Sequence, residues 1–522
     1  MDLFSIGFVS FIAVFLILYY VLPKRFQPVI LLLANILFYL VAGKWNLIFI
    51  MVTALTVWAG ALKIGSFSNE YKDKRKEAGS DKEEKKRLKE KYLRKKRIVL
   101  ALVLLINFGI LAYMKYFRVL AGFKGGLLLP LGISFYTFQA AGYLTDVYGG
   151  KYDPEKRFPD FLLFVSFFPQ LIQGPINRYD ALKEQFKKDH VLTSEKVKNA
   201  VFLIIYGLMK KYAVANMLSD SIEAVLGGDT ASMPGSLIVF SILMYSAEQY
   251  ADFSGGIDIV LGVAKLFDIE MMPNFRQPYF STSLEDFWRR WHISLGAWMR
   301  DYVFYPFALL KFNQKAGKWS SEHINKHFGR VLPAAISNIV VFFLVGIWHG
   351  AYLHYVLWGL YNGIIISLAD MLSPVFQSVN KALHIPEKSV PMHVFRVIRT
   401  FIIVNIGWYF DRIEDVGKCI SCLERSVSDF APGAFRDAIN IVILNSNSQS
   451  PLYALGGMCL AAVGIIVIFT ISFIREKGIA IGKRNGVGYN ILYGSTVTVL
   501  SLMLLFSFIF MRSAGGFMYA NF

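Results

Sequence analysis

Long apolar runs recur along the chain and constrain its fold more than any other feature of the sequence. About twelve of them approach the roughly 20 residues that a helix needs to cross a bilayer. Charged residues make up only 18% of the chain, against roughly a quarter in soluble proteins. The sequence therefore predicts an all-α integral membrane protein. The expected crossings are Leu3–Leu22, Gln27–Ala42, Trp45–Leu62, Ile98–Met114, Leu127–Val147, Val201–Met217, Ser236–Ala264, Val331–Trp348, Tyr352–Ala369, Val394–Tyr409, Leu452–Ile474 and Ile491–Met511.

The net charge of +18 would suit a nucleic-acid-binding protein, but its distribution argues against that function. About fifteen basic residues lie within residues 63–97, interleaved with acidic ones, and few aromatic residues, such as Tyr71 and Tyr92, lie among them. This pattern indicates a solvated, largely helical loop without the aromatic residues that stack on bases. Basic loops between apolar runs mark the cytoplasmic face of a membrane protein, so we expect residues 63–97 to be cytoplasmic.

The order of charges around the first apolar run predicts the orientation of the chain. Leu3–Leu22 is followed by Lys24 and Arg25 and preceded by no basic residue, whereas a secretory signal carries its positive charge first. We therefore expect a retained helix with its amino end outside. An even number of crossings then places the carboxyl terminus outside as well, in a multi-pass protein of the plasma membrane.

One apolar segment, residues 161–173, is too short to cross and is flanked by basic residues on both sides. Runs of this length are more often re-entrant or interfacial. The segment ends in Pro169-Gln170-Leu171-Ile172-Gln173-Gly174-Pro175. Such amides and prolines are tolerated at membrane depth only where protein or a water-filled cavity satisfies them.

The segment Asn274–Phe307 is too polar to cross and unusually aromatic. Ser283 is a plausible N-cap, and the apolar residues that follow it recur at steps of three and four, which predicts an amphipathic interfacial helix over 283–300. These apolar residues are Phe287, Trp288, Trp291, Leu295 and Trp298, and the basic residues expected at phosphate level are Arg289, Arg290 and Arg300. A simple membrane anchor is the alternative, and His292 within it would then be structural.

His349 follows an apolar run in the segment Gly346-Ile347-Trp348-His349-Gly350-Ala351. An ionisable side chain at the broken end of a membrane segment is a functional candidate, and histidine suits general base work near neutral pH. The alternative is a core histidine that is hydrogen-bonded to a neighbouring helix.

The last nine residues, 514–522, contain a Gly-Gly hinge and an aromatic tail with Tyr519. Either an aromatic anchor at the outer interface or a tail that folds back into a cavity fits this composition. The three cysteines predict neither a disulfide framework nor a zinc site, because Cys419 and Cys422 form a lone pair. Cys459 lies in an apolar run and is expected in the core.

Four blocks of sequence together resemble the membrane-bound O-acyltransferase (MBOAT) family. They are PLGISFYTFQ (130–139), FPQLIQGPINRY (168–179), FRQPYFSTSLEDFWRRWHISLGAWMRDYVFYPF (275–307) and GIWHGA (346–351). They occur in order over nearly the whole chain, and FWRRWHISL and WHGA are specific as a pair. Within the family, the chain resembles the alginate O-acetyltransferase membrane subunit branch, which acts in cell-wall and exopolysaccharide acetylation.

The resemblance implies a ring of about 11–12 transmembrane helices, with re-entrant and interfacial helices around a central tunnel. Residues 98–411 would form the catalytic core, which includes the re-entrant element 161–173 and the interfacial helix 283–300. The other expected segments are the N-terminal transmembrane helices 1–62, the cytoplasmic basic loop 63–97, the extracytoplasmic loop 412–451, and the C-terminal transmembrane helices with the aromatic tail 452–522.

The resemblance also assigns roles to residues. The invariant histidine of the family falls on His349, the expected general base, and the second histidine of this branch falls on His292, which would orient the donor or complete the tunnel. Acetyl-CoA is the implied cytoplasmic donor and no metal is implied. The expected donor-binding residues are Arg289, Arg290 and Arg300, with Lys311 a weaker candidate, and the expected tunnel-lining residues are Gln170, Gln173, Asn177 and Trp348.

The acceptor is expected outside the membrane. Tyr519 is in the tyrosine position of the aromatic tail motif and would pass the acetyl group to an extracytoplasmic serine-hydrolase-like transferase, which modifies a polysaccharide; direct transfer from the site of His349 is the competing route. Met518 replaces the usual isoleucine of the motif. His354 and Asn362 also depart from the common pattern, near WHGA and in YNG.

Three alternatives stay open at the level of sequence. A D-alanyl transferase of teichoic acids belongs to the same family, but its branch is shorter and takes its tail motif from a separate peptide. A lysophospholipid or sterol acyltransferase would share the fold but fits the FWRRWHISL block poorly. A transporter or flippase would carry acidic residues within its crossings, and the candidates for those are Asp146, Asp252 and Asp258.

Overall fold

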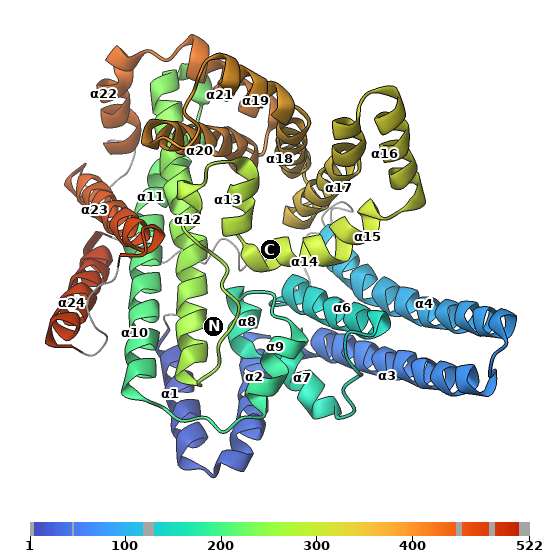
Figure 1. Cartoon of the computed structure of the whole chain (residues 1–522). Coiled ribbons are helices and arrows are strands. Elements are labelled where there is room, and N and C mark those ends of the chain that lie inside the picture. Colours follow the sequence, from blue (N-terminus) through green and yellow to red (C-terminus); the bar gives the residue numbers. More distant parts are fainter. Residues whose placement is uncertain (1–4, 44–45, 118–129, 445–450, 480–485, 511–522) are drawn as a thin grey trace. The chain divides into compact units, whose positions relative to one another are not determined.

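The structure, a computed structural model, describes residues 5–43, 46–117, 130–444, 451–479 and 486–510 (Figure 1). Throughout these ranges the regular structure is helical, apart from one isolated antiparallel bridge between Phe275 and Trp291. The chain is thus an all-α integral membrane protein, as its apolar runs predict. Its described helices divide into two compact units.

Unit 1 contains the described residues up to Ala200 together with Val260–Met272. Its helices are α1 (Ile6–Val21), α2 (Gln27–Ala42), α3 (Leu47–Glu77), α4 (Lys82–Ala112), α6 (Ile133–Gly149), α7 (Phe158–Ser166), α8 (Phe168–Gln173) and α9 (Tyr179–Phe186), with the beginning of α10 (Ser194–Met209) and the end of α12 (Gly235–Leu266).

Unit 2 contains Val201–Ile259 and the described residues from Pro273 onward. Besides the remainder of α10 and α12, it holds the π-helical turn η4 (Lys210–Ala215), α11 (Asn216–Ile222), α13 (Leu284–Arg290), α14 (Ile293–Met299), α15 (Tyr305–Ala308), α16 (Lys311–His323), α17 (Lys326–His349), α18 (Leu353–Met371), α19 (Ser373–Ala382), α20 (Val390–Arg412), α21 (Val416–Ser428), α22 (Phe435–Ala438), α23 (Pro451–Glu476) and α24 (Val487–Phe510).

Fewer helices meet the length and hydropathy of a membrane crossing than the sequence predicts. Within the described ranges there are 8, or up to 9 if the bent pair α18 and α19 is one span. The other three expected crossings form α1 with 16 residues, α6 with 17 residues, and α12, which is long but more polar. Their shortness or polarity explains the difference from about twelve.

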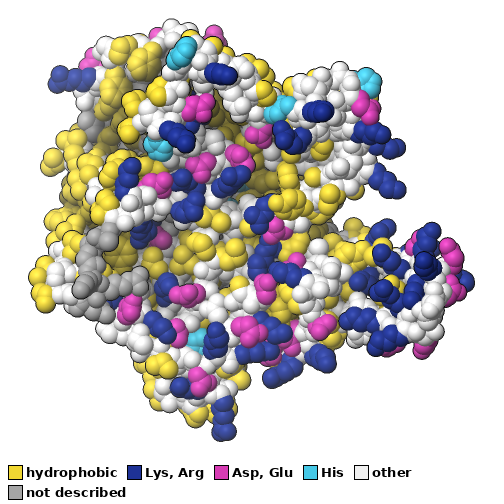
Figure 2. Space-filling model, viewed as in Figure 1, with side chains coloured by type: hydrophobic (Ala, Val, Ile, Leu, Met, Phe, Trp, Pro, Cys, Tyr) yellow, Lys and Arg dark blue, Asp and Glu magenta, His cyan; other side chains and the backbone are white. Residues whose placement is uncertain are grey.

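The basic segment 63–97 is helical, as its charge pattern predicts. α3 and α4 each have 31 residues, about 46 Å at a rise of about 1.5 Å per residue, and so exceed the roughly 30 Å of bilayer hydrocarbon. The two helices pack against each other, and Lys and Arg side chains crowd their distal ends (Figure 2). The apolar parts of both helices therefore continue into a solvated helical pair.

Apolar side chains cover much of the surface around α23 and α24 (Figure 2). Leu505, Ile466 and Phe469 are 62%, 64% and 59% exposed. Exposure of this extent is expected where lipid, and not water, contacts the protein. Cys459 on α23 is exposed as well, so its expected place in the core is wrong: its apolar neighbours in the sequence face outward with it.

The prediction of a single helix over 283–300 is also wrong, because this segment forms two helices. Ser283 does cap α13, with its hydroxyl accepting from the backbone N–H of Asp286. The helix then ends at Arg290, and α14 begins at Ile293. Two residues with non-helical backbone separate the two helices, because residues 274–276 pair with the chain at this point.

Candidate active site

His292 lies at the break between α13 and α14 and is 3% exposed. Its backbone has a φ of 48°, a left-handed conformation that costs energy in a residue other than glycine. The Asn274 side chain holds this turn. Its Oδ1 accepts from the backbone N–H of Ser294 at 3.0 Å and the hydroxyl at 2.9 Å, and lies 3.2 Å from Nδ1 of His292.

Aromatic rings surround the imidazole of His292. Phe253 of α12 packs edge-on at 4.8 Å between ring centroids, and Trp348 of α17 lies at 5.8 Å. Since Trp348 directly precedes His349, this contact brings the last turn of α17 to the α13–α14 break. The structure thus brings His292 into contact with a residue 56 positions further along the sequence.

His349 is the last residue of α17 and is 4% exposed. The rings of Trp348, Tyr355 and Trp358 lie 5.1, 5.8 and 4.6 Å from its own. The close packing of α17 on α18 explains this arrangement. A Cβ at Gly346 would clash with the carbonyl oxygen of Tyr355, and one at Gly359 would clash with that of Phe342.

The two departures from the family pattern both take part in packing around this site. Asn362 accepts a hydrogen bond from Nε1 of Trp288 at 3.0 Å and thereby ties α18 to α13. His354 lies with its Nδ1 2.8 Å from the carbonyl oxygen of Phe410 and so joins α18 to α20. Each residue therefore has a structural use in this chain.

Burial lowers the pKa of His292 to about 3, because the charged imidazolium loses its hydration in this apolar surrounding. The ring is therefore neutral near pH 7. A neutral imidazole can donate one hydrogen bond and accept another, which suits a residue that orients a reacting group.

The three arginines of the expected donor site each face a carboxylate. Arg289 pairs with Glu285, and Arg300 pairs with Asp301 at 2.9 Å; their side chains are 69% and 58% exposed. Arg290 is 13% exposed and binds Asp286 and Glu476, each at 2.9 Å. Arg290 thus anchors α13 to α23, whereas Arg289 and Arg300 are accessible to a soluble ligand.

The expected tunnel amides lie in unit 1, and all three are buried. Oε1 of Gln170 accepts from Nε2 of Gln139 at 2.8 Å and from Nδ2 of Asn177 at 3.0 Å. Oδ1 of Asn177 also accepts from the backbone N–H of Met272. Neither polar atom of the Gln173 side chain has a hydrogen-bond partner among the described residues. Their role in a tunnel stays a prediction.

Two buried lysines on the π-helical turn η4 were not predicted from the sequence. Nζ of Lys210 lies 2.6 Å from Asp258, and Nζ of Lys211 lies 2.5 Å from Asp252. Two adjacent lysines in an apolar run, followed by two aspartates further along the chain, were the sequence signal that could have predicted these pairs. Asp146 pairs with Lys151, so each acid that the transporter alternative needs is bound to a cation.

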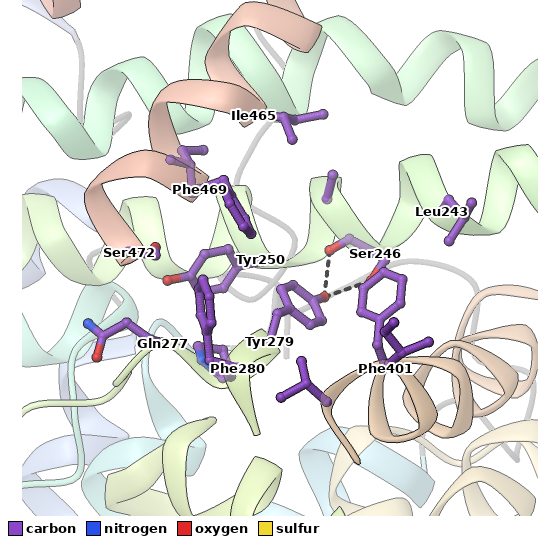
Figure 3. Close-up of a pocket in the computed structure, with 15 residues that line it drawn as sticks. Leu243, Ser246, Tyr250, Gln277, Tyr279, Phe280, Phe401, Ile465, Phe469 and Ser472 are labelled. Atoms are coloured by element: carbon purple, nitrogen blue, oxygen red, sulfur yellow. Dashed lines mark hydrogen bonds between the residues drawn. The ribbon is translucent and has the colours of Figure 1, made fainter. Parts of the chain in front are cut away.

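A cavity of about 400 Å³ in unit 2 was also missed (Figure 3). It lies among α12, the 3₁₀ turn Pro278–Phe280, α20 and α23, and its walls are mostly aliphatic and aromatic. The hydroxyl of Tyr279 donates to the carbonyl oxygen of Ser246 at 2.7 Å and accepts from its hydroxyl at 2.8 Å. Rings of Tyr250 and Tyr279 in its wall contact Trp291, so an aromatic layer lies between this cavity and His292.

Tyr519 lies outside the described residues. No group of three or more His, Cys, Asp or Glu side chains suited to holding a metal ion occurs in the described part of the chain. In unit 2, the candidate site consists of His292 and His349, both buried and both in contact with aromatic rings.

Comparison with known proteins finds consistent relatives. The model of the MBOAT, membrane-bound O-acyltransferase family matches residues 155–321 and 308–384, which include both histidines. A protein named Probable alginate O-acetylase, from Pseudomonas syringae, is 31% identical over 78% of this chain and 71% of its own length. Helicobacter pylori peptidoglycan O-acetyltransferase is 28% identical over 82% and 83%. Bacillus subtilis teichoic acid D-alanyltransferase is 27% identical over 54% and 68%.

Proposed function

Because the chain belongs to the membrane-bound O-acyltransferase family and is an O-acyltransferase, we propose that it moves acetyl groups from cytoplasmic acetyl-CoA to an extracytoplasmic polysaccharide. Relatives named for O-acetylation of alginate and peptidoglycan support the acyl group and the acceptor class, since they match 78% and 82% of the chain. The D-alanyltransferases match 54% and 49%.

One observation carries the proposal. His292 and His349 come from separate segments of unit 2, both are buried, and Trp348 contacts both rings. His349 ends a membrane-crossing helix. A purely structural histidine would need neither this position nor a second buried histidine against the same tryptophan ring.

In the proposed reaction, His349 takes the proton of the acceptor hydroxyl as its oxygen attacks the thioester carbonyl. The tetrahedral intermediate collapses with cleavage of the C–S bond, and the imidazolium returns the proton to the leaving thiolate. General base catalysis of this kind contributes about 10²–10⁴-fold. His292, neutral and fixed by Asn274, orients the donor carbonyl. The surrounding rings exclude water, which would otherwise hydrolyse the thioester.

Arg289 and Arg300 are the proposed contacts for the phosphates of coenzyme A. Their side chains are exposed, and a guanidinium offers a planar fork of donors to phosphate. Arg290 contributes indirectly, because it fixes α13 through Asp286 and Glu476. Gln170, Gln173, Asn177 and Trp348 are the proposed polar and aromatic lining of the tunnel.

The proposed route beyond the membrane uses Tyr519 as an acceptor, which passes the acetyl group to a serine-hydrolase-like transferase. This step rests on the resemblance of the tail to the aromatic motif of the branch. Direct transfer from the site of His349 to the partner or the polysaccharide is the competing route.

The test uses the purified chain in nanodiscs with radiolabelled acetyl-CoA, and compares the wild type with His349→Ala and Tyr519→Phe. Label on the wild-type protein that is lost in both variants supports donor, base and relay together. Turnover lost only in His349→Ala keeps the acetyltransferase and removes the tyrosine relay. Turnover with a D-alanyl carrier-protein thioester, and none with acetyl-CoA, overturns the proposal in favour of D-alanyl transfer.

A further inference from the structure

Unit 1 contains a pocket of about 430 Å³ that is basic on one part of its wall and apolar on another. It lies among the beginning of α2, the beginning of α7, and α9. Its cationic lining residues are Arg25, Arg157, Lys183 and Lys187, and its aliphatic ones are Val29, Leu32 and Leu163.

The cations of this pocket are only loosely paired. Nζ of Lys187 lies 3.8 Å from Glu155 and 3.9 Å from Asp160, and Nζ of Lys183 lies 3.5 Å from Glu155. Nη1 of Arg157 lies 3.8 Å from Asp160. These separations exceed hydrogen-bond length, so the N–H donors are not consumed.

Two carboxylates do not neutralise the pocket. Burial alone would raise the pKa of Glu155, but hydrogen bonds from Tyr179 and from the backbone of Arg157, with the nearby lysines, lower it. Glu155 is therefore ionised near pH 7. Four basic side chains thus face two acidic ones, Glu155 and Asp160. Arg25 forms no ion pair within the described ranges, and its guanidinium lies over the ring of Phe26.

The position of the pocket on its helices matches the edge of a bilayer. The crossing helix that contains α2 begins at Lys24 and ends at Val41. Along it the lining passes from Arg25 to Val29 and Leu32, and along α7 it passes from Arg157 to Leu163. Charge thus comes first and aliphatic surface follows on both helices, which is the order of a lipid headgroup and its acyl chain.

We propose that this pocket binds an anionic glycerophospholipid. Its phosphate lies against Arg157, Lys183, Lys187 and Arg25, and an acyl chain lies along the aliphatic wall of α2 and α7. Basic pockets at the ends of membrane helices are known to take such headgroups. A soluble phosphate ester would leave the aliphatic wall uncovered, which is why a lipid fits better. This inference does not depend on the proposed reaction.

The basic pocket on α4 gives a matched contrast. It is lined by Glu84, Arg87, Leu88, Glu90, Lys91, Arg94, Lys95 and Ile98, all on one helix. Four basic residues face two acidic ones there, as in the first pocket, but all eight lining residues come from a single helix and two of them are aliphatic. If basic surface attracts anionic lipid in general, both pockets should contribute to binding. If the first pocket is a specific headgroup site, that pocket alone should contribute.

The experiment measures binding of phosphatidylglycerol to the purified full chain by native mass spectrometry, with phosphatidylcholine as the zwitterionic reference. Arg157→Gln/Lys187→Gln should weaken phosphatidylglycerol binding about tenfold or more, since each basic residue near an anionic headgroup contributes roughly fivefold in affinity. Arg87→Gln/Lys91→Gln removes the same charge from the α4 pocket and should leave binding unchanged. Arg25→Gln, at an exposed residue, gives a fold-preserving check and should weaken binding roughly fivefold.

Three results would overturn the proposal. Equal losses in the two double variants would reduce it to unspecific attraction by basic surface. Equal binding of phosphatidylcholine and phosphatidylglycerol would remove the phosphate contacts. Displacement of phosphatidylglycerol by coenzyme A would assign the pocket to a soluble phosphate ester. Because no turnover is measured, failure here is distinct from failure of the proposed reaction.

Discussion

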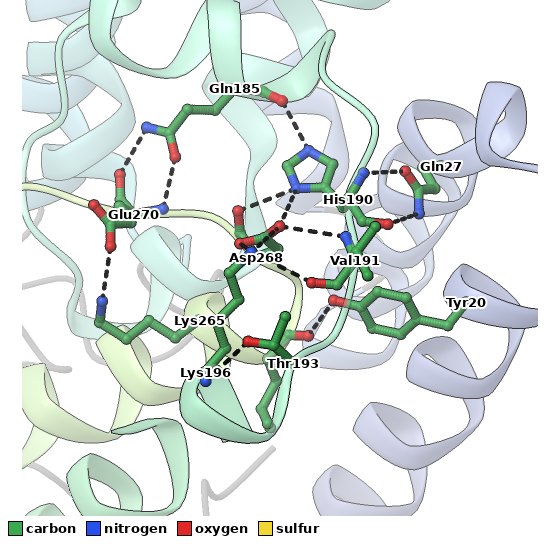
Figure 4. A network of polar contacts seen from close by, with 11 residues as sticks. Tyr20, Gln27, Gln185, His190, Val191, Thr193, Lys196, Lys265, Asp268 and Glu270 are labelled. Carbon is green, nitrogen blue, oxygen red and sulfur yellow. Dashed lines mark hydrogen bonds and ion pairs between the residues drawn. The ribbon is translucent and has the colours of Figure 1, made fainter. Parts of the chain in front are cut away.

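Two neighbourhoods of buried histidine differ in how they hold the ring. In unit 1, His190 is held by polar groups: its Nδ1 lies 3.1 Å from the carbonyl oxygen of Asp268, and its Nε2 lies 2.8 Å from that of Gln185 (Figure 4). In unit 2, His349 packs among three aromatic rings. Polar groups thus lie at hydrogen-bond distance from both nitrogens of His190, whereas aromatic rings pack around His349.

The network around His190 joins three segments of unit 1 (Figure 4). Gln27, at the start of α2, exchanges two hydrogen bonds with the backbone of His190, at 3.0 and 3.2 Å. Nζ of Lys196 lies 2.7 Å from the carboxylate of Asp268, and the Tyr20 hydroxyl donates to the carbonyl oxygen of Leu266. Equal burial of two histidines therefore says little about their roles, and the groups that surround each ring say more.

The largest expected effect comes from replacing His349 of unit 2 with glutamine. His349→Gln should reduce acetyl transfer by about 10²–10⁴-fold, because the general base is lost. The free energy of unfolding should change by less than about 1 kcal/mol, since the aromatic packing tolerates a similar volume. Turnover in nanodiscs and thermal unfolding in detergent measure the two quantities. His323→Gln, at a histidine on the surface helix α16, is the control. Normal transfer by His349→Gln would remove His349 from the reaction.

The ion pairs of the η4 lysines give the next largest effect. Lys210→Met leaves the carboxylate of Asp258, which is 14% exposed, without its cation and should destabilise the protein by up to about 3–5 kcal/mol. Lys210→Met/Asp258→Leu should recover most of this loss, because no unpaired charge remains. Thermal unfolding of both variants tests this expectation. A double variant as unstable as the single one would show that the pair contributes more than mutual neutralisation.

A pH titration extends the comparison to His292. Its folded pKa of about 3 lies below the ordinary value of 6.5, so the unfolded chain binds a proton more readily. The stabilising contribution is therefore complete above about pH 6.5 and is lost as the pH falls towards 3, by up to about tenfold in the folding equilibrium per pH unit. His292→Gln should flatten this part of the stability profile. Parallel profiles for the variant and the wild type would contradict the burial of a neutral ring.

The sequence predicts those features that depend on local pattern. Apolar runs predict the membrane helices, and glycines around His349 predict a helix end at that position. The break at His292 was not predicted, because Asn274, 18 positions earlier, imposes it. The partner of Arg290 is 186 positions away in α23, and Lys210 meets Asp258 across 48 positions. Contacts at such separations leave no periodicity in the sequence.

The smallest expected effect comes from replacing His190, whose ring is surrounded by polar groups, with glutamine. His190→Gln should lower the free energy of unfolding by about 1–3 kcal/mol, because the ring nitrogens lie 3.1 and 2.8 Å from the carbonyl oxygens of Asp268 and Gln185 and a buried carbonyl oxygen loses its donor. Acetyl transfer per folded molecule should stay within about twofold of wild type. Thermal unfolding and turnover, measured as for His349→Gln, give the opposite division of effects between stability and activity.

The different surroundings of His190 and His349 are the reason to expect that one substitution affects mainly stability and the other mainly activity. Contacts of its two nitrogens with backbone carbonyl oxygens make His190 a connector of chain segments, so its loss should destabilise the fold. A loss of transfer at His190 as large as at His349, in a variant that unfolds at the wild-type temperature, would contradict it. The assignment of His349 would then rest on its family alone.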